Sequence, residues 1–273
     1  MVNPGSNSKK PQVKAYFSST APIPEKKADT NPPTLTAESV FVLDLNSNTI
    51  LFEKNPHKRL RPASLTKIMT SLVALDYYKE DNILKVVNGQ LSLGNTIELL
   101  RNDEILAKNL IEGLLISSGN DAAVVLAENY PGGYKAYVDK MNQKVLELGL
   151  ENTHFSNVSG VESPNHYTTA YDIAMMAKDG LTRPAFERIV SQRKANFKSL
   201  KGTPYSLTST NILLNKPGFY GVKTGWTPLA GECLVVLADK DAHPILISIL
   251  NSKDRFGEAE KITNWVYQNY TWN

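Results

Sequence analysis

Cysteine is almost absent from this sequence, which holds a single one, Cys233, among its 273 residues. One cysteine excludes an internal disulfide and any cysteine-based metal cluster. The four histidines show no metal-ligand spacing such as His-x-x-x-His. The sequence therefore predicts no metal centre. Cys233 alternates with apolar neighbours, so we expect it to be buried in a strand and unreactive.

Long apolar runs are missing as well. The sequence contains no stretch of 18 apolar residues and no hydrophobic core of a signal peptide. Its apolar fraction of 41% is ordinary for a globular protein, and its length is enough for a large core. The sequence predicts a soluble chain, and we expect any targeting or membrane-anchoring segment to lie outside it.

Outside the first 36 residues the sequence also lacks a net charge. The formal net charge of the chain is +3. Residues 1–36 account for this excess, since they carry five lysines against Glu25 and Asp29. The remainder holds 25 basic and 25 acidic residues. A balanced domain offers no overall basic face, so nucleic acid is not expected as a partner.

The order of patterns along the chain predicts one α/β domain. Residues 1–36 contain six of the fifteen prolines and few large apolar groups, which is typical of a disordered tail or linker. Two strands, a block of helices, further strands and a final amphipathic helix follow over residues 37–273. We expect strands at 39–45, 49–54, 193–199, 219–225, 231–239 and 243–251, with a helical subdomain inserted at about 62–192.

The stretch around Ser64 carries the first candidate chemistry. Pro62 suits a first helical turn, and an apolar stripe at helical spacing runs behind it. Ser64 and Lys67 are three residues apart, so they lie on one helix face. A serine becomes a nucleophile when a nearby base takes its proton, and a lysine can be that base if burial or positive charge lowers its pKa. The same spacing at Ser6 and Ser191 shows that the pattern alone is not specific.

Two further motifs follow in the chain. Ser118-Gly119-Asn120 lies where one predicted helix ends and another begins, and Ser-x-Asn also occurs elsewhere in polar loops. Lys223-Thr224-Gly225 occurs once, in a predicted strand. Glycine in that strand lets a ligand backbone come close. Taken singly, the first motif fits a loop with a helix cap and the second fits a strand-end lysine.

Together and in this order, the three motifs resemble the set found in class A β-lactamases and penicillin-binding proteins. More closely, the chain is similar to low-molecular-mass penicillin-binding proteins that are serine-type D-alanyl-D-alanine carboxypeptidases. The resemblance covers about residues 37–272. It rests on three extended segments and two shorter ones between them: Arg61–Thr70, Ile116–Ala123, Gly221–Thr227 with Ala230-Gly231, Asn152–Asn157 and His166–Asp172.

The resemblance implies a five-stranded antiparallel sheet flanked by helices, with the site in the cleft beside the helical subdomain. Ser64 would attack the carbonyl between two D-alanines of a peptidoglycan stem peptide, with Lys67 as general base and Ser118 as proton relay. Five residues would bind substrate: Asn120, Lys223, Thr224, Gly225 and Trp226. The backbone N–H groups of Ser64 and Trp226 would form the oxyanion hole.

The same resemblance implies no metal or organic cofactor. The partners would be stem peptides ending in D-Ala-D-Ala and β-lactam antibiotics, in an extracytoplasmic compartment of a bacterium. One departure concerns Thr210, which aligns where some relatives place an arginine that helps to hold the substrate carboxylate. His166 lies in a polar loop, where a lone histidine is more often structural than catalytic.

Two alternatives stay open at this point. A β-lactamase needs a glutamate that activates the deacylating water. Glu151, Glu162 and Glu187 fall between the second and third motifs, but none has the β-lactamase loop pattern, and Gly119 replaces the aspartate of Ser-Asp-Asn. A catalytically silent sensor of peptidoglycan or β-lactams is the other alternative. Such a binding module would not need a Ser–Lys pair.

Overall fold

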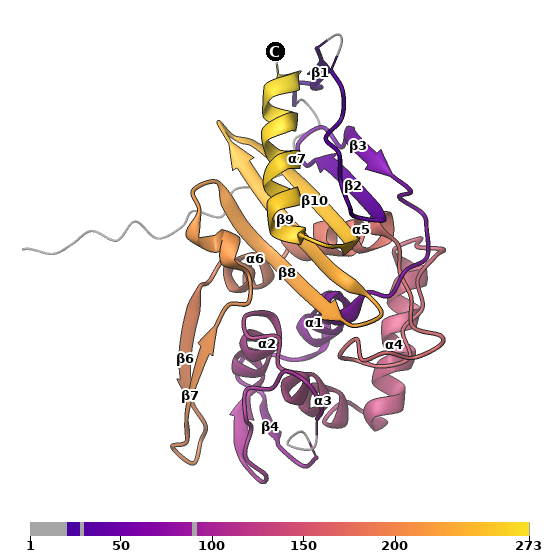
Figure 1. Ribbon diagram of the computed structural model, residues 1–273. Coiled ribbons are helices and arrows are strands. Elements are labelled where there is room, and N and C mark those ends of the chain that lie inside the picture. Colours follow the sequence, from indigo (N-terminus) through magenta and orange to yellow (C-terminus); the bar gives the residue numbers. More distant parts are fainter. Residues whose placement is uncertain (1–20, 28–29, 89–91, 273) are drawn as a thin grey trace, which may run out of the picture.

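The computed structural model describes residues 21–27, 30–88 and 92–272. They form a five-stranded antiparallel sheet with helices packed around it (Figure 1). The strand order is β3-β2-β10-β9-β8. The strands are β2 (Ser39–Asp44), β3 (Ile50–Lys54), β8 (Phe219–Thr227), β9 (Gly231–Lys240) and β10 (His243–Ser252). The chain leaves the sheet after β3 and returns at β8, which confirms the predicted fold class.

Both faces of the sheet are covered by helices. Val40 and Val42 of β2 pack into one core cluster together with residues of helix α7 (Arg255–Asn269). The alternate residues Phe41 and Leu43 belong to a second cluster, which contains the helices that follow β3. Because successive side chains of a strand point to opposite faces, a strand covered on both sides reads as a continuous apolar run.

The helices between β3 and β8 form the predicted helical region, with α1 at its centre (Figure 1). From Thr66 to Ala74 every residue of α1 is buried. The Tyr137 hydroxyl of α4 donates a hydrogen bond to the Thr70 carbonyl oxygen at 2.6 Å. The helices are α1 (Thr66–Tyr77), α2 (Ala107–Leu115), α3 (Asn120–Glu128), α4 (Gly133–Glu147), α5 (Ala170–Leu181) and α6 (Pro184–Val190).

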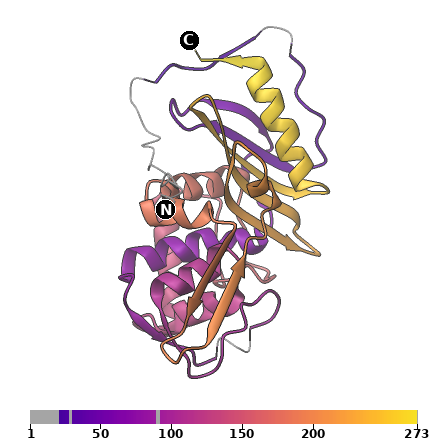
Figure 2. The ribbon, with the colours of Figure 1, turned by 90° about the vertical axis from the view of Figure 1, so that its left-hand side faces the viewer.

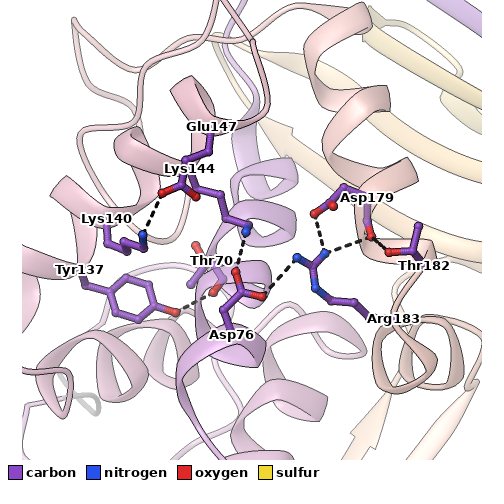
Figure 3. A network of polar contacts seen from close by, with 9 residues as sticks. All are labelled: Thr70, Asp76, Tyr137, Lys140, Lys144, Glu147, Asp179, Thr182 and Arg183. Carbon is purple, nitrogen blue, oxygen red and sulfur yellow. Dashed lines mark hydrogen bonds and ion pairs between the residues drawn. The ribbon is translucent and has the colours of Figure 1, made fainter.

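A polar network fixes the C-terminal end of α1 to its neighbours (Figure 3). Asp76 of α1 accepts from Lys144 Nζ of α4 at 2.5 Å and from Arg183 Nη2 at 3.2 Å. Arg183, just after α5, also pairs with Asp179 at 2.5 Å. Lys144 is only 8% exposed, so its ion pair is less screened than a surface pair. The network holds the helix that directly follows the turn containing Ser64.

Two small hairpins complete the region beside the helices. Strands β4 (Ile83–Lys85) and β5 (Glu104–Leu106) pair with each other, as do β6 (Lys194–Lys198) and β7 (Pro204–Thr208). Figure 2 shows the β6–β7 hairpin in front of the helices. The sequence analysis predicted β6 but neither β7 nor α6.

The sequence analysis predicted a disordered tail or linker over residues 1–36, but residues 21–27 and 30–36 contact the folded domain. Strand β1 (Glu25–Lys26) pairs with β11 (Tyr270–Thr271). Trp265 Nε1 of α7 donates to the Asn31 carbonyl oxygen at 2.7 Å. Aromatic residues of the C-terminal segment thus provide the apolar surface that this proline-rich stretch lacks. The remaining part of the predicted tail lies outside the described residues. Among the helices that the structure describes, none has the length and apolar character needed to cross a membrane.

Candidate active site

Ser64 lies in a single 3-10 turn, η1 (Ala63–Leu65), directly before α1. Its two neighbours in the turn are buried, whereas Ser64 is partly exposed. Ala63 adopts a φ of +48°, in the left-handed region that residues other than glycine rarely occupy. Strain of this kind persists only where the surrounding structure enforces it. The turn therefore presents the Ser64 hydroxyl in a conformation that its neighbours must hold.

Lys67 is fully buried and directly contacts Ser64. Its Nζ lies 2.9 Å from Ser64 Oγ and donates to the Ser159 carbonyl oxygen at 2.8 Å. Burial lowers the pKa of Lys67 well below the usual lysine value, and the positive charge of Lys223 lowers it further. A neutral amine at this distance can take the proton of the serine hydroxyl. The predicted Ser64–Lys67 contact is present.

The loop of residues 156–166 packs directly against the Ser64 turn. Gly160 has a φ of +87°, and a Cβ atom there would lie only 1.8 Å from the Ala63 carbonyl oxygen. Only glycine allows this close backbone approach. The neighbouring Ser159 carbonyl is the one that binds Lys67. One loop thus contacts both the nucleophile turn and the candidate base.

His166 of the same loop belongs to a hydrogen-bonded chain that ends at Ala63. Its Nδ1 accepts from the Ser156 backbone N–H at 3.1 Å, which leaves the proton on Nε2. Nε2 then donates to Thr66 Oγ1 at 2.7 Å, and Thr66 Oγ1 donates to the Ala63 carbonyl oxygen at 2.9 Å. Burial lowers the pKa of His166 to about 4, so the ring is neutral at physiological pH. This geometry gives His166 a supporting role under the nucleophile turn.

Ser118 and Asn120 lie between α2 and α3, at the N-terminal end of α3. Ser118 has a φ of +59°, a second left-handed residue at the site. Asn120 Nδ2 donates to the Leu93 carbonyl oxygen at 2.5 Å. Its other side-chain atom, Oδ1, is buried and has no hydrogen-bond partner among the described residues. A buried acceptor without a partner is costly and indicates a place for a ligand N–H.

Strand β8, at the edge of the sheet, places the third motif beside Ser64. A Cβ atom on Gly225 would lie 3.0 Å from the Ser64 backbone nitrogen and 3.1 Å from the Pro62 carbonyl oxygen. The glycine is thus needed for the approach of β8 to the Ser64 turn, in addition to the predicted room for a ligand. Lys223 is buried, and its Nζ donates to the Thr224 carbonyl oxygen at 3.0 Å. Trp226, which follows Gly225, is 60% exposed.

Sequence reasoning missed Arg255, the first residue of α7. Its Nη1 donates to the Gly225 carbonyl oxygen at 2.7 Å. Its buried Nε has no partner among the described residues. Burial, together with the positive charge of Arg255, lowers the pKa of Lys223 to about 7. Arg255 is 30 residues from Gly225 in sequence, and no local pattern links the two.

Thr210 connects the two walls of the site. Its Oγ1 lies 2.5 Å from Thr224 Oγ1 of β8. Its backbone N–H donates to the Ile116 carbonyl oxygen at the end of α2, at 3.3 Å. Thr210 thus lies beside Thr224, one of the residues predicted to bind the substrate. A hydroxyl stands here where some relatives are expected to have a cation.

Asp121 is a second residue that sequence reasoning missed. Its carboxylate is fully buried and accepts from two backbone N–H groups ahead of α2: that of Ile97, shared between both oxygens at 3.0–3.1 Å, and that of Leu99 at 3.0 Å. Its negative charge raises the pKa of Lys67 and so partly opposes the effect of burial. The adjacent motif Ser118-Gly119-Asn120 gave the only available signal for this position.

The arrangement supports nucleophilic chemistry on a carbonyl carbon. It combines a partly exposed serine, a buried amine at hydrogen-bond distance, an orphan amide oxygen and a second buried lysine. In the part of the chain that the structure describes, no group of three or more His, Cys, Asp or Glu residues is placed to hold a metal ion. Cys233 is buried as predicted, and burial raises the pKa of its thiol to about 11.

Comparison with known sequences gives a consistent family. Residues 26–254 match the family described as D-alanyl-D-alanine carboxypeptidase. The chain is 34% identical over 244 residues to the D-alanyl-D-alanine carboxypeptidase DacF of Bacillus subtilis, covering 86% of this chain and 63% of that protein. It is 30% identical over 243 residues to a D-alanyl-D-alanine endopeptidase of Escherichia coli, covering 86% of this chain and 78% of the relative. The chain thus spans less than two thirds of the length of DacF.

Comparison with solved structures gives the same fold. The Streptomyces K15 DD-transpeptidase superposes with a TM-score of 0.83 at 28% identity, covering 88% of this chain and all of the other. A penicillin-binding protein homolog from Mycobacterium tuberculosis, Rv2911, gives a TM-score of 0.83 at 27% identity, with coverage of 89% and 96%. These matches extend over both the sheet and the helical region.

Proposed function

The chain belongs to the D-alanyl-D-alanine carboxypeptidase family, and from this membership we propose that it is itself a serine-type D-alanyl-D-alanine carboxypeptidase. Its substrate is the D-Ala-D-Ala end of a peptidoglycan stem peptide, from which it removes the terminal D-alanine. The observation that carries this proposal is the buried Lys67 with a lowered pKa, 2.9 Å from Ser64 Oγ.

Acylation begins when Lys67 takes the proton of the Ser64 hydroxyl. The Ser64 oxygen attacks the carbonyl carbon between the two D-alanines and forms a tetrahedral oxyanion. Backbone N–H groups of Ser64 and Trp226 stabilise this oxyanion, and the close packing of β8 on the Ser64 turn supports that role. The carbon–nitrogen bond then breaks, and Ser118 relays a proton to the leaving D-alanine amine. The product is an ester on Ser64.

Substrate binding uses both walls of the site. Asn120 Oδ1, the buried acceptor without a partner, receives an N–H of the stem peptide. Lys223 and the hydroxyl of Thr224 bind the terminal carboxylate, with Thr210 beside Thr224. Arg255 adds positive charge behind Lys223. Gly225 keeps the strand close to the Ser64 turn.

Deacylation requires a water molecule and the Lys67–Ser118 pair. Among the described residues no glutamate contacts Ser64 or Lys67. Glu162 is exposed, and its Oε1 accepts from the Leu229 backbone N–H at 2.9 Å. This geometry does not favour the β-lactamase alternative. Penicillin therefore forms a long-lived ester on Ser64, because its retained ring fragment obstructs the deacylating water.

This function places the protein outside the cytoplasm of a bacterial cell, where peptidoglycan is found. The expected partners are stem peptides and β-lactams, and nucleic acid is not among them. No cofactor is required for the proposed steps.

The test follows D-alanine release from a peptide ending in D-Ala-D-Ala and the mass of the protein after treatment with penicillin. We expect D-alanine release and a mass gain equal to one intact penicillin on Ser64. The Ser64→Ala variant should show neither. Rapid penicillin turnover without D-alanine release would support a β-lactamase, and adduct formation without turnover of peptide would support a sensor.

A further inference from the structure

Residues 188–231 depart from the balanced charge of the rest of the domain. The chain has 27 acidic residues in 273, about one in ten, but none in this segment, which contains seven basic residues. Three of the seven are engaged elsewhere: Arg188 pairs with Glu112, Lys216 pairs with Glu260, and Lys223 is buried in the site. The other four are exposed and belong to the β6–β7 hairpin and its immediate flank: Arg193, Lys194, Lys198 and Lys201.

The hairpin has an inner and an outer face. On the inner face Phe197 stacks on Tyr205, with ring centroids 5.0 Å apart. The register of the strands gives three exposed cross-strand pairs on the outer face: Lys194 with Thr208, Asn196 with Ser206, and Lys198 with Pro204. Lys194 and Lys198 are four residues apart on one face, which at about 3.3 Å per residue separates them by ~13 Å along the strand. The outer face is thus a polar strip with a cation at each end.

No ion pair among the described residues neutralises the positive charge of this strip. Arg193, Lys194 and Lys198 make no ion pair with any residue in the described ranges. Two acidic residues contact the hairpin: Asp103 accepts from the Tyr205 hydroxyl at 2.7 Å on the inner side, and the Glu104 carbonyl oxygen accepts from the Leu200 backbone N–H at 2.9 Å beside the hairpin turn. Figure 2 shows the hairpin on the outside of the molecule, with the helices behind it. The outer face is free to meet an anionic partner.

The strip begins at the edge of the active site. Ser117, the residue before Ser118, donates from Oγ to the Thr208 carbonyl oxygen at 3.2 Å and accepts from the Thr208 backbone N–H at 3.0 Å. Two residues later Thr210 contacts Thr224 of β8. A polymer bound between the two walls would therefore meet the hairpin directly.

We propose that the outer face of the β6–β7 hairpin is a docking surface for polymeric peptidoglycan, and this proposal rests on the function proposed above. Stem peptides carry free carboxylates, which the cations at the ends of the strip attract, and Asn196 and Ser206 between them can hydrogen-bond the polymer. Docking holds a large substrate beside Ser64 and raises its local concentration. A membrane surface fits less well, because binding in a lipid interface needs buried apolar area and the centre of this strip is polar.

The experiment measures binding to purified peptidoglycan sacculi by co-sedimentation, in the Ser64→Ala background so that no turnover occurs. The test variant is Lys194→Gln/Lys198→Gln. The matched control is Lys240→Gln/Lys253→Gln, which removes two exposed lysines elsewhere. We expect the test variant to bind about 3–10-fold more weakly at low salt, with the difference lost in high salt, and the control to bind like its parent.

Four comparisons complete the design. Sacculi stripped of phosphate polymers should bind as before, whereas sacculi whose carboxylates are amidated should bind the parent protein more weakly. With Ser64 present, the ratio of D-alanine release from sacculi to release from a short peptide should fall in the test variant.

Equal binding by the two double variants would overturn the proposal. So would a loss of binding confined to vesicles of anionic phospholipid, or confined to the phosphate polymers. If the parent enzyme releases no D-alanine from any substrate, the proposed function fails while sedimentation still decides the docking surface.

Discussion

At the residue scale, the site depends on two buried lysines whose pKa values are both lowered. Burial and the charge of Lys223 lower the pKa of Lys67 well below the usual lysine value. Lys223 has a pKa of about 7, lowered by burial and by Arg255. One lysine must be neutral to act as a base, and the other must be charged to bind a carboxylate. Burial lowers the pKa of both lysines, and each has a different positive neighbour: Lys223 acts on Lys67, and Arg255 acts on Lys223.

This pair predicts the pH dependence of acylation. The rate should rise with pH as Lys67 loses its proton, through an ionisation well below that of free lysine, and should fall above about pH 7 as Lys223 loses its charge. Removing the base in Lys67→Ala should reduce acylation by about 10²–10⁴-fold. The measurement is the second-order rate of penicillin acylation against pH. A flat profile with chemistry rate-limiting would refute the assignment of Lys67.

The residue scale also shows how far the sequence alone can reach. The Ser64–Lys67 contact follows from i,i+3 helical spacing, so it could be predicted without a structure. Arg255 and Asp121 could not, because their contacts depend on how distant segments pack. His166 could be placed near the site only by resemblance, and its hydrogen-bonded chain to Ala63 needed coordinates.

At the element scale, the Ser64 turn is held by a loop that is about 100 residues away in sequence. The Thr66 hydroxyl connects the two, since its oxygen accepts a hydrogen bond from His166 Nε2 and its proton is donated to the Ala63 carbonyl oxygen. Removing this hydroxyl frees a strained residue directly before the nucleophile. Small displacements of a nucleophile can cost up to about 10²-fold in rate.

The corresponding prediction compares two substitutions of Thr66. Thr66→Val keeps the shape and removes the hydroxyl, so penicillin acylation should slow by about 10–100-fold with little change in initial penicillin binding. Thr66→Ser keeps the hydroxyl and should retain most of the rate. Stopped-flow acylation separates the two steps, and the melting temperature checks the fold. Equal rates for the two variants would show that the hydroxyl does not position the turn.

Element boundaries were predictable where an apolar period ran for several turns or residues. The hairpin of β2 and β3, the strands β8 to β10 and the helix α7 followed from such patterns. Strand β7 was missed because only Tyr205 and Leu207 face inward in a segment of Pro, Ser and Thr. The pairing of β1 with β11 was missed because the partner surface is formed by aromatic residues more than 230 residues later in the sequence.

At the scale of the whole molecule, the buried lysines should reduce stability. A lysine whose pKa is lowered in the folded state binds its proton more tightly in the unfolded state, so protonation favours unfolding. The resulting cost is largest at low pH. It declines as pH rises toward the unfolded-state lysine pKa of about 10.4, where the unfolded chain also loses the proton. An active site built on Lys67 and Lys223 thus opposes the stability gained from the two apolar cores.

Replacing either lysine by methionine tests this trade-off. Lys67→Met and Lys223→Met keep an unbranched side chain of similar length and remove the ionisable group, so each should raise the melting temperature while reducing acylation. A chain of this size gains about 2–4 °C for each kcal/mol. The gain over the parent should be large at pH 7 and should narrow toward pH 10, whereas Lys253→Met, at an exposed lysine, should show no such pH-dependent gain. A gain that is independent of pH would mean that packing, and not proton linkage, sets the stability of the site.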